Sequence, residues 1–128
     1  MIFEGLRTFL LADATISNLI GVRAYSQKLP QDPTLPAIVI TTISGQERYS
    51  TEGATGPPIG RFQIDSWDST QAGSRTLGAA VRARLSGYKG AAGSESIKGA
   101  FIENDFDMYD YELNKYRRFQ DYTINFTG

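Results

Sequence analysis

The sequence predicts a single α+β domain over residues 1–128, with a mainly antiparallel sheet and helices packed on one face. Apolar residues at helical spacing open the chain and return once in its middle, whereas alternating or β-branched segments fill much of the rest. That order suits a sheet covered by helices. With 128 residues, 41% hydrophobic and 21% charged, the chain is long and apolar enough to bury one core.

The first part of the chain is expected to hold two helices followed by strands. An apolar stripe predicts the first helix, and Asp13 can cap the second by accepting backbone N–H bonds, while Gly21 can end it. A proline-rich connection then precedes the densest β-branched run. The expected elements are helix Ile2–Ala12, helix Asp13–Leu19, a short strand Val22–Tyr25 and a strand Ala37–Ile43.

The middle of the chain is expected to hold a long loop and a half-buried strand. Gln46–Ile59 is polar and rich in glycine and proline, which predicts a long mobile loop. Arg61–Trp67 then alternates, with Phe62 and Ile64 toward the core. The opposite face, Arg61, Gln63 and Asp65, is expected to be solvated.

A long helix and further strands complete the prediction. Asp68 or Ser69 is expected to cap a helix that runs to about Ser86, and Gly87 to end it. Its inward residues are Ala72, Leu77, Ala80, Val81 and Leu85, and its outward residues are Arg75, Arg82 and Arg84. The remaining segments are a flexible turn Tyr88–Glu95, a strand Ser96–Ile102, an acidic aromatic loop or hairpin Glu103–Glu112, and a strand Tyr116–Phe126 with Tyr122, Ile124 and Phe126 on one face.

The composition argues against several kinds of chemistry. The chain has no histidine and no cysteine, which removes the commonest general base and all cysteine-based metal sites. The glycines between Gly87 and Gly93 lack the Gly-Lys-Ser/Thr ending of a phosphate loop. Asp105, Asp107 and Asp110 lack the calcium-loop pattern, because its sixth and twelfth positions would be Asp110 and Tyr116. We therefore expect no catalytic, cofactor or metal site.

Charge and hydropathy bear on the partners. The formal net charge of −1 provides no overall basic field for nucleic acid. The basic aromatic run Lys115–Phe119 is expected to pair with acidic neighbours, in the same subunit or the next. No apolar run reaches the roughly 18 residues of a membrane span, so no membrane partner is expected.

Taken in order, these segments resemble the small tail-completion proteins of long-tailed bacteriophages, which are related to tail-terminator and tail-to-head joining proteins. No single segment is a sharp motif, and the match lies in their collinearity over nearly the whole chain. The matching segments are Ile2–Ala14, Val22–Tyr25 with Leu29-Pro30, Leu35–Ile40 with Ser44-Gly45, Arg61–Trp67, Val81–Gly87 and Tyr116–Phe119.

The resemblance implies a virion structural protein that forms a ring, commonly of six copies, at the head-proximal end of the tail. Such a ring stops polymerisation of the tail tube protein, docks to the head-completion or connector protein, and lets DNA pass through its lumen without specific binding. It would be assembled in the host cytoplasm. The candidate assembly surfaces are Ser50 and Glu52 in the long loop, Arg82 and Arg84 on the helix, and Asp105, Asp107, Tyr109 and Asp110 in the acidic segment. Arg82 and Arg84 could pair with Glu103–Glu112 of a neighbouring subunit.

Two other functions remain open from the sequence. A head-side connector or adaptor protein would occupy the neighbouring ring of the neck. A small ligand-binding module would instead require a pocket with convergent polar groups.

Overall fold

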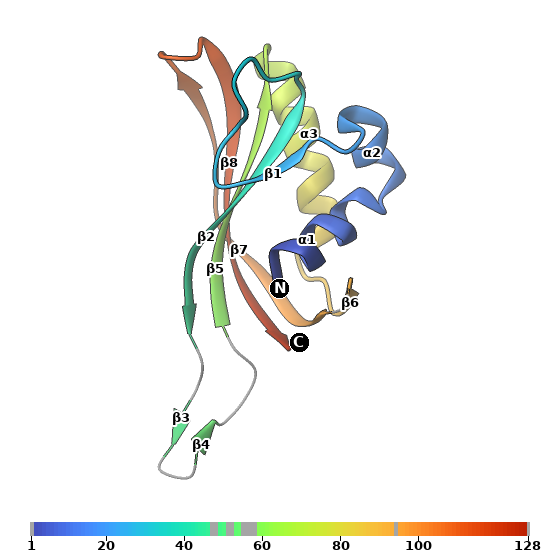
Figure 1. The fold of residues 1–128 in the computed structure, drawn as a ribbon, viewed down its shortest axis with the longest axis vertical. Coiled ribbons are helices and arrows are strands. Elements are labelled where there is room, and N and C mark those ends of the chain that lie inside the picture. The colour runs from blue at the N-terminus through green and yellow to red at the C-terminus, as the bar shows by residue number, and fades with distance from the viewer. Residues whose placement is uncertain (1, 47–48, 51–52, 55–58, 94, 128) are drawn as a thin grey trace.

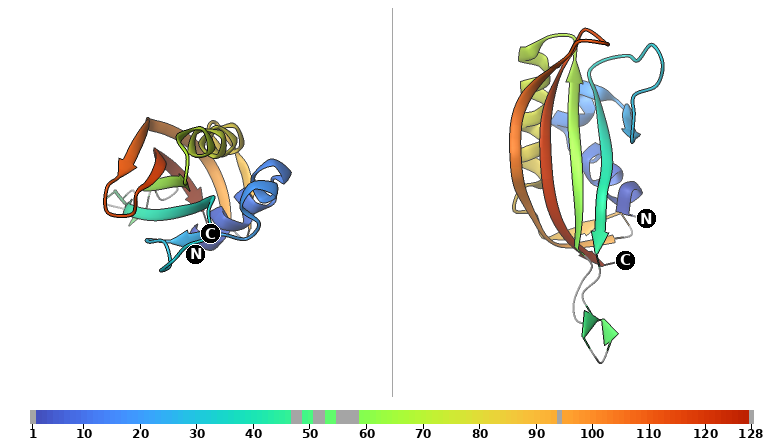
Figure 2. Two further views of the ribbon diagram at one scale, coloured as in Figure 1. Left: turned by 90° about the horizontal axis from the view of Figure 1, so that it is seen from above. Right: turned by 90° about the vertical axis from the view of Figure 1, so that its left-hand side faces the viewer.

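A computed structural model of the chain describes residues 2–46, 49–50, 53–54, 59–93 and 95–127, and these form three helices, a curled six-stranded sheet and a separate two-stranded pair. The helices cover one face of the sheet, and Figure 2 looks onto the other face in its right-hand view. The predicted α+β class, with a mainly antiparallel sheet and helices on one face, is confirmed.

The sheet brings together strands from all parts of the chain (Figure 1). Its strand order is β1-β2-β5-β8-β7-β6, and β1 pairs with β2 in parallel whereas the other pairs are antiparallel. The elements are α1 (Ile2–Leu11), α2 (Ala14–Ile20), β1 (Ala24–Ser26), β2 (Ala37–Gln46), β3 (Tyr49–Ser50), β4 (Gly53–Ala54), β5 (Ile59–Asp68), α3 (Gln71–Leu85), β6 (Gly90–Ala92), β7 (Glu95–Asp110) and β8 (Lys115–Thr127).

The core lies between the helices and the covered face of the sheet. Tyr122 is its largest fully buried side chain, and Phe62 and Ile64 are buried as their alternation predicts. No described helix has the length and apolar character needed to cross a membrane. Other core side chains are Leu6, Phe9, Leu10, Ile16, Ile20, Ile38, Ile40, Leu77, Val81, Leu85, Ile97 and Ile124.

Side-chain caps mark the N-terminal ends of helices α2 and α3. Asp13 accepts from the backbone N–H groups of Thr15 and Ile16, at 2.8 and 3.2 Å, as predicted. The predicted cap of α3 was wrong: Thr70, rather than Asp68 or Ser69, accepts from the N–H of Gly73 at 3.0 Å. Thr70 stands directly before the first helical residue, which is the position a capping side chain needs.

The inward face of α3 differs in part from the prediction. Ala72 is exposed, and Ser74 and Gly78 are buried instead. Gly78 lies against β8, where a Cβ atom would stand 2.6 Å from Cγ of Arg118. The missing side chain therefore lets α3 approach the sheet closely.

Strands also occur in three segments that were predicted as a loop, a flexible turn, and a loop or hairpin. Within Gln46–Ile59, β3 pairs with β4 beyond the ends of β2 and β5 (Figure 1), and residues 47–48, 51–52 and 55–58 lie outside the described residues. Within Tyr88–Glu95, β6 pairs with β7. Glu103–Asp110 belongs to β7, which pairs with β8 through to Asp110↔Lys115, so only the turn at 111–114 interrupts this hairpin. Pairing with β8 overrides the low strand propensity of the acidic residues.

Candidate assembly surface

The sheet face that the helices leave uncovered, here called the open face, carries alternate residues of β2, β5, β8 and β7. The register places Val39, Asp65, Phe119 and Phe106 in one row across these strands. The neighbouring rows are Ala37, Trp67, Arg117 and Met108 on one side, and Thr41, Gln63, Asp121 and Asn104 on the other. Side chains directly opposite in antiparallel strands are neighbours, so the residues of each row lie side by side across the sheet.

Exposed aromatic side chains mark the β7 side of this face. Phe106 stacks on Phe119 with ring centroids 4.7 Å apart and is 44% exposed. Phe101, opposite Thr123, is 55% exposed. Large apolar side chains exposed on one surface are typical of protein contact sites.

The tip of the β7–β8 hairpin presents three tyrosine rings. Tyr109 lies between Tyr111 and Tyr116, with ring centroids 4.9 and 4.8 Å away, and donates a hydrogen bond to Asn114 at 3.1 Å. Asp110 closes the turn by accepting from the N–H of Leu113 at 2.9 Å. Tyr111 is exposed, so the tip offers a shaped aromatic surface.

The open face also buries two carboxylates, of which Asp65 was expected to be solvated. Asp65 is only 3% exposed, and Asp121 is 7% exposed. Asp65 accepts from Gln63 at 2.6 Å and from Arg117 at 3.4 Å, while Asp121 pairs with Arg61. Burial raises the pKa of Asp65, and its bonds to Gln63 and Arg117 only partly offset this.

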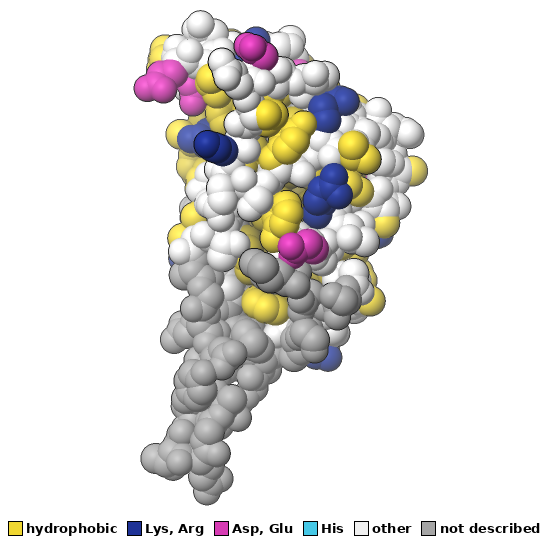
Figure 3. Space-filling view, viewed as in Figure 1, with side chains coloured by type: hydrophobic (Ala, Val, Ile, Leu, Met, Phe, Trp, Pro, Cys, Tyr) yellow, Lys and Arg dark blue, Asp and Glu magenta, His cyan; other side chains and the backbone are white. Residues whose placement is uncertain are grey.

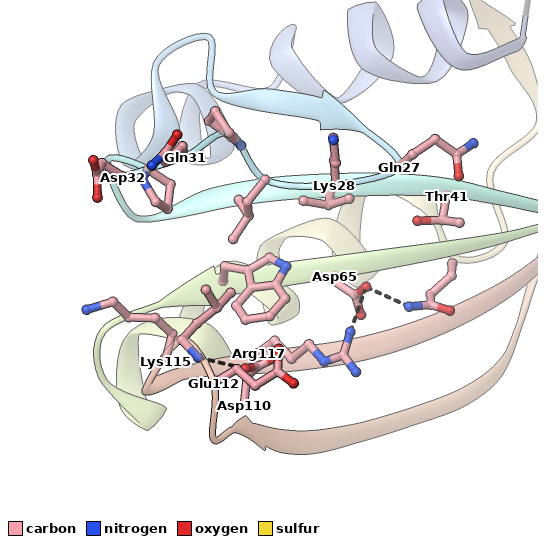
Figure 4. A pocket seen from close by; sticks show the side chains of 17 residues that line it. Gln27, Lys28, Gln31, Asp32, Thr41, Asp65, Asp110, Glu112, Lys115 and Arg117 are labelled. Carbon is pink, nitrogen blue, oxygen red and sulfur yellow. Dashed lines mark hydrogen bonds and ion pairs between the residues drawn. The ribbon is translucent and has the colours of Figure 1, made fainter.

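A groove of about 1080 Å³ lies at the end of the open face near the β7–β8 turn (Figure 4). Segment 27–33 forms one wall, β2 and β5 form the floor, and the hairpin tip forms the other wall. The polar residues labelled in Figure 4 reach it from four separate segments of the chain. No pattern in the sequence predicts this groove, because it depends on how segment 27–33 lies over the sheet.

On the helix-covered side, a second set of charges ties β7 and β8 to α3. Arg118 donates to Asp105 at 2.6 Å and to Asp107 at 2.9 Å. Arg82 donates to Asp105, and Arg75 to Asp107, each at 2.7 Å. Burial alone would raise the pKa of both carboxyls, but the arginine hydrogen bonds outweigh it and hold these pKa values below their usual range.

The predicted site residues therefore fall into separate regions. Arg82, Asp105 and Asp107 are paired within the chain, which satisfies charges that the sequence offered to a neighbouring subunit. Arg84 does not point outward: it donates to the carbonyl of Phe9 at 3.2 Å and lies 4.1 Å from the centre of that ring. Tyr109 and Asp110 lie together at the hairpin tip, Ser50 lies in β3, and Glu52 is outside the described residues.

The described residues include no group of three or more potential metal ligands, and in Figure 3 acidic and basic side chains are interspersed on the visible face. Exposed aromatic rings on an uncovered sheet are typical of surfaces through which proteins contact one another.

The comparisons with known proteins identify the family. A sequence profile described as tail completion protein gp17 matches residues 4–127, so the chain belongs to this family. Among solved structures, the fold is similar to a chain in the virion of a native gene transfer agent particle, with a TM-score of 0.75 and 17% identity over 99% of this chain and 92% of that one. No curated protein matches the sequence. The chain is accordingly a structural protein of a virion tail.

Proposed function

We propose that this protein forms a ring, of six copies, at the head-proximal end of the tail, where it terminates polymerisation of the tail tube and joins the tail to the head connector. Membership in a tail completion family supports the location. The observation that carries the proposal is the open face, whose Phe101 and Phe106 side chains are about half exposed. A ring contact joins two different surfaces of neighbouring copies, and the open face supplies one of them.

The extension formed by β3 and β4 is proposed as a second contact. Figure 1 shows this pair away from the helices and from the main sheet, beyond the ends of β2 and β5. It carries Ser50 and, in the sequence, Glu52. Deleting Ser50–Pro57 should weaken ring formation and leave the subunit folded, because the core described for the rest of the chain is built from residues outside this segment. Unchanged assembly would remove the extension from the proposal.

The hairpin tip, with Tyr109 and Asp110, is proposed to face the head connector. Asp105 and Asp107 lie further along β7 and are held by arginines of the same chain. Replacing Asp110 with Asn should therefore impair joining to the head while rings still form. If it impairs ring formation, the tip is a contact between ring subunits instead.

A pair of substitutions that introduces negative charge tests the open face. Phe101→Asp with Phe106→Asp should abolish ring formation in the presence of tail tube protein, because a buried contact cannot take two unpaired carboxylates. Val22→Asp is the matched control, since Val22 is 72% exposed and precedes β1, outside the open face. Light scattering gives the mass, and circular dichroism checks the fold. Rings from the double variant would show that the open face is not a subunit contact.

A further inference from the structure

The groove on the open face is lined by apolar side chains from several segments of the chain. Leu29 and Pro30 line it from segment 27–33, Leu113 from the β7–β8 turn, and Trp67 from β5. Its volume of about 1080 Å³ is slightly above the roughly 300–1,000 Å³ of typical small-ligand pockets. Its walls and floor combine apolar with polar side chains, a mixture that suits the side chains and backbone of an extended chain.

Two buried polar atoms at its floor lack hydrogen-bond partners among the residues that the structure describes. They are Oδ1 of Asp65, which can only accept, and Nε of Arg117, which can only donate. Ser66 and Asp121 also hold an unpaired buried oxygen, but neither lines the groove. Buried polar groups nearly always have partners in folded proteins, so this acceptor and this donor have bonding capacity that a ligand in the groove can use.

The contact between Asp65 and Arg117 is long enough to let a ligand bind there. At 3.4 Å, it is longer than the other arginine–aspartate contacts of the chain that the structure describes. Arg117 is 23% exposed and lies 5.3 Å from the centre of the Trp67 ring, so a ligand in the groove can reach its guanidinium. Asp65 lines the same groove.

The charges of the groove point to an uncharged ligand. Three basic residues face four acidic ones, a formal sum of −1 with both signs interspersed, so no strong field of one sign selects an anion or a cation. They are Lys28, Lys115 and Arg117 against Asp32, Asp65, Asp110 and Glu112. A peptide group carries one donor and one acceptor and no net charge. It complements Oδ1 of Asp65 and the free N–H groups of Arg117 together.

We propose that this groove binds an extended, uncharged segment of a partner protein, with a peptide group held by Asp65 and Arg117 and an apolar side chain packed against Trp67. The groove lies on the open face, and the test uses the isolated subunit, so a failure to bind the probe is distinguishable from a failure to form rings. It assigns the groove a ligand class that neither the contacts within the chain nor the family description supplies.

Trp67 is the sole tryptophan, so its fluorescence and its indole N–H signal in nuclear magnetic resonance report on the groove directly. The probe is N-acetyl-leucine methylamide, which carries two peptide groups and one apolar side chain. We expect a saturable response with a dissociation constant of about 1 mM, typical of so small a ligand. Arg117→Gln should weaken binding about fivefold to tenfold, because a hydrogen bond to a charged group is lost.

Arg61→Gln is the matched control, because Arg61 is an open-face arginine paired with Asp121 outside the groove. Its affinity for the probe should equal that of the unmodified protein. Leu113→Ala, at an exposed position of the turn, provides a second variant that leaves the core intact and should weaken binding about twofold to threefold. The proposal is overturned if the probe gives no saturable response, if Arg117→Gln binds it unchanged, or if acetate or guanidinium binds as tightly, since then the groove holds water or an ion.

Discussion

Arg117 and Arg118 are consecutive residues of β8 with nearly equal exposure, 23% and 25%, yet their contacts differ sharply. Arg118, on the helix-covered face, donates to two carboxylates at 2.6 and 2.9 Å. Arg117, on the open face, has one contact of 3.4 Å with Asp65 and keeps a buried unpaired Nε. Exposure alone therefore does not separate a structural arginine from one available to a ligand; the completeness of its hydrogen bonding does.

The carboxylates on the two faces show the same contrast. All four oxygens of Asp105 and Asp107 accept from an arginine, and the pKa of each carboxyl is lowered. Asp65 has one oxygen without a partner among the described residues, and burial raises its pKa. The arginine-paired Asp105 and Asp107 on the helix-covered face stabilise the fold. On the open face, Asp65 and Arg117 each keep a buried polar atom without a partner among the described residues.

The largest expected effect is a difference in the free energy of unfolding between variants of the two arginines. Arg118→Met should lower the free energy of unfolding by about 3 kcal/mol, since two short charge-assisted hydrogen bonds are lost and two half-paired carboxylates remain. Arg117→Met should cost only about 1 kcal/mol, because its one contact is long. Urea denaturation measures both. Equal losses in the two variants would contradict the contrast between the two faces.

Gly78→Ala sharpens the comparison by disturbing the covered face alone. The added Cβ would meet Cγ of Arg118 at 2.6 Å, so α3 or the arginine must shift, at a cost of about 1–2 kcal/mol. The loss should shrink when Arg118 is already Met. Additive losses in this double-mutant cycle would show that the glycine and the arginine are independent.

Removing one carboxylate from each face should change stability in opposite directions at pH 7. Asp105→Asn should cost about 1–2 kcal/mol, because Arg82 and Arg118 each lose a charged partner. Asp65→Asn should leave stability unchanged or raise it by up to about 1 kcal/mol, since a poorly paired buried charge is removed. Thermal denaturation at pH 7 decides, and a loss at Asp65 as large as that at Asp105 would contradict the account of the open face.

The differences in stability between these two variants and the unmodified protein should both depend on pH, which is the smallest effect. The lowered pKa of Asp105 gives stability that is present above its unfolded pKa of about 3.9 and is lost as the pH falls through the folded pKa. The raised pKa of Asp65 makes its ionisation costly, and the cost disappears as the pH falls below the folded pKa. Between pH 7 and pH 3, both differences from the unmodified protein should therefore shrink. A deficit at Asp105 that persists at pH 3 would mean that its charge is not the cause.

Local patterns in the sequence were sufficient where an element depends on its neighbours along the chain. The alternation of Phe62 and Ile64 and the capping pattern at Asp13 are of this kind, and both predictions were confirmed. Glu103–Glu112 was predicted as a loop or hairpin, and its part up to Asp110 is a strand of a hairpin whose partner, β8, follows after the turn. Cross-strand contacts of this kind are not visible in the segment itself.

The groove and the buried Asp65 could not be predicted for a related reason. Alternation correctly placed Asp65 opposite Ile64, on the other face of β5, but it could not show that Val39 and Phe119 flank it or that segment 27–33 walls the groove. The basic run Lys115–Phe119 was correctly expected to find acidic partners, and the structure divides them between the two faces of the sheet.

The most direct test of the proposed role is the mass of the purified protein in solution, measured by light scattering, first alone and then with the matching tail tube protein. We expect a species of about six times the 14.1 kDa chain mass, either alone or when the tube end is present. A protein that remains monomeric and ignores the tube would contradict the terminator role.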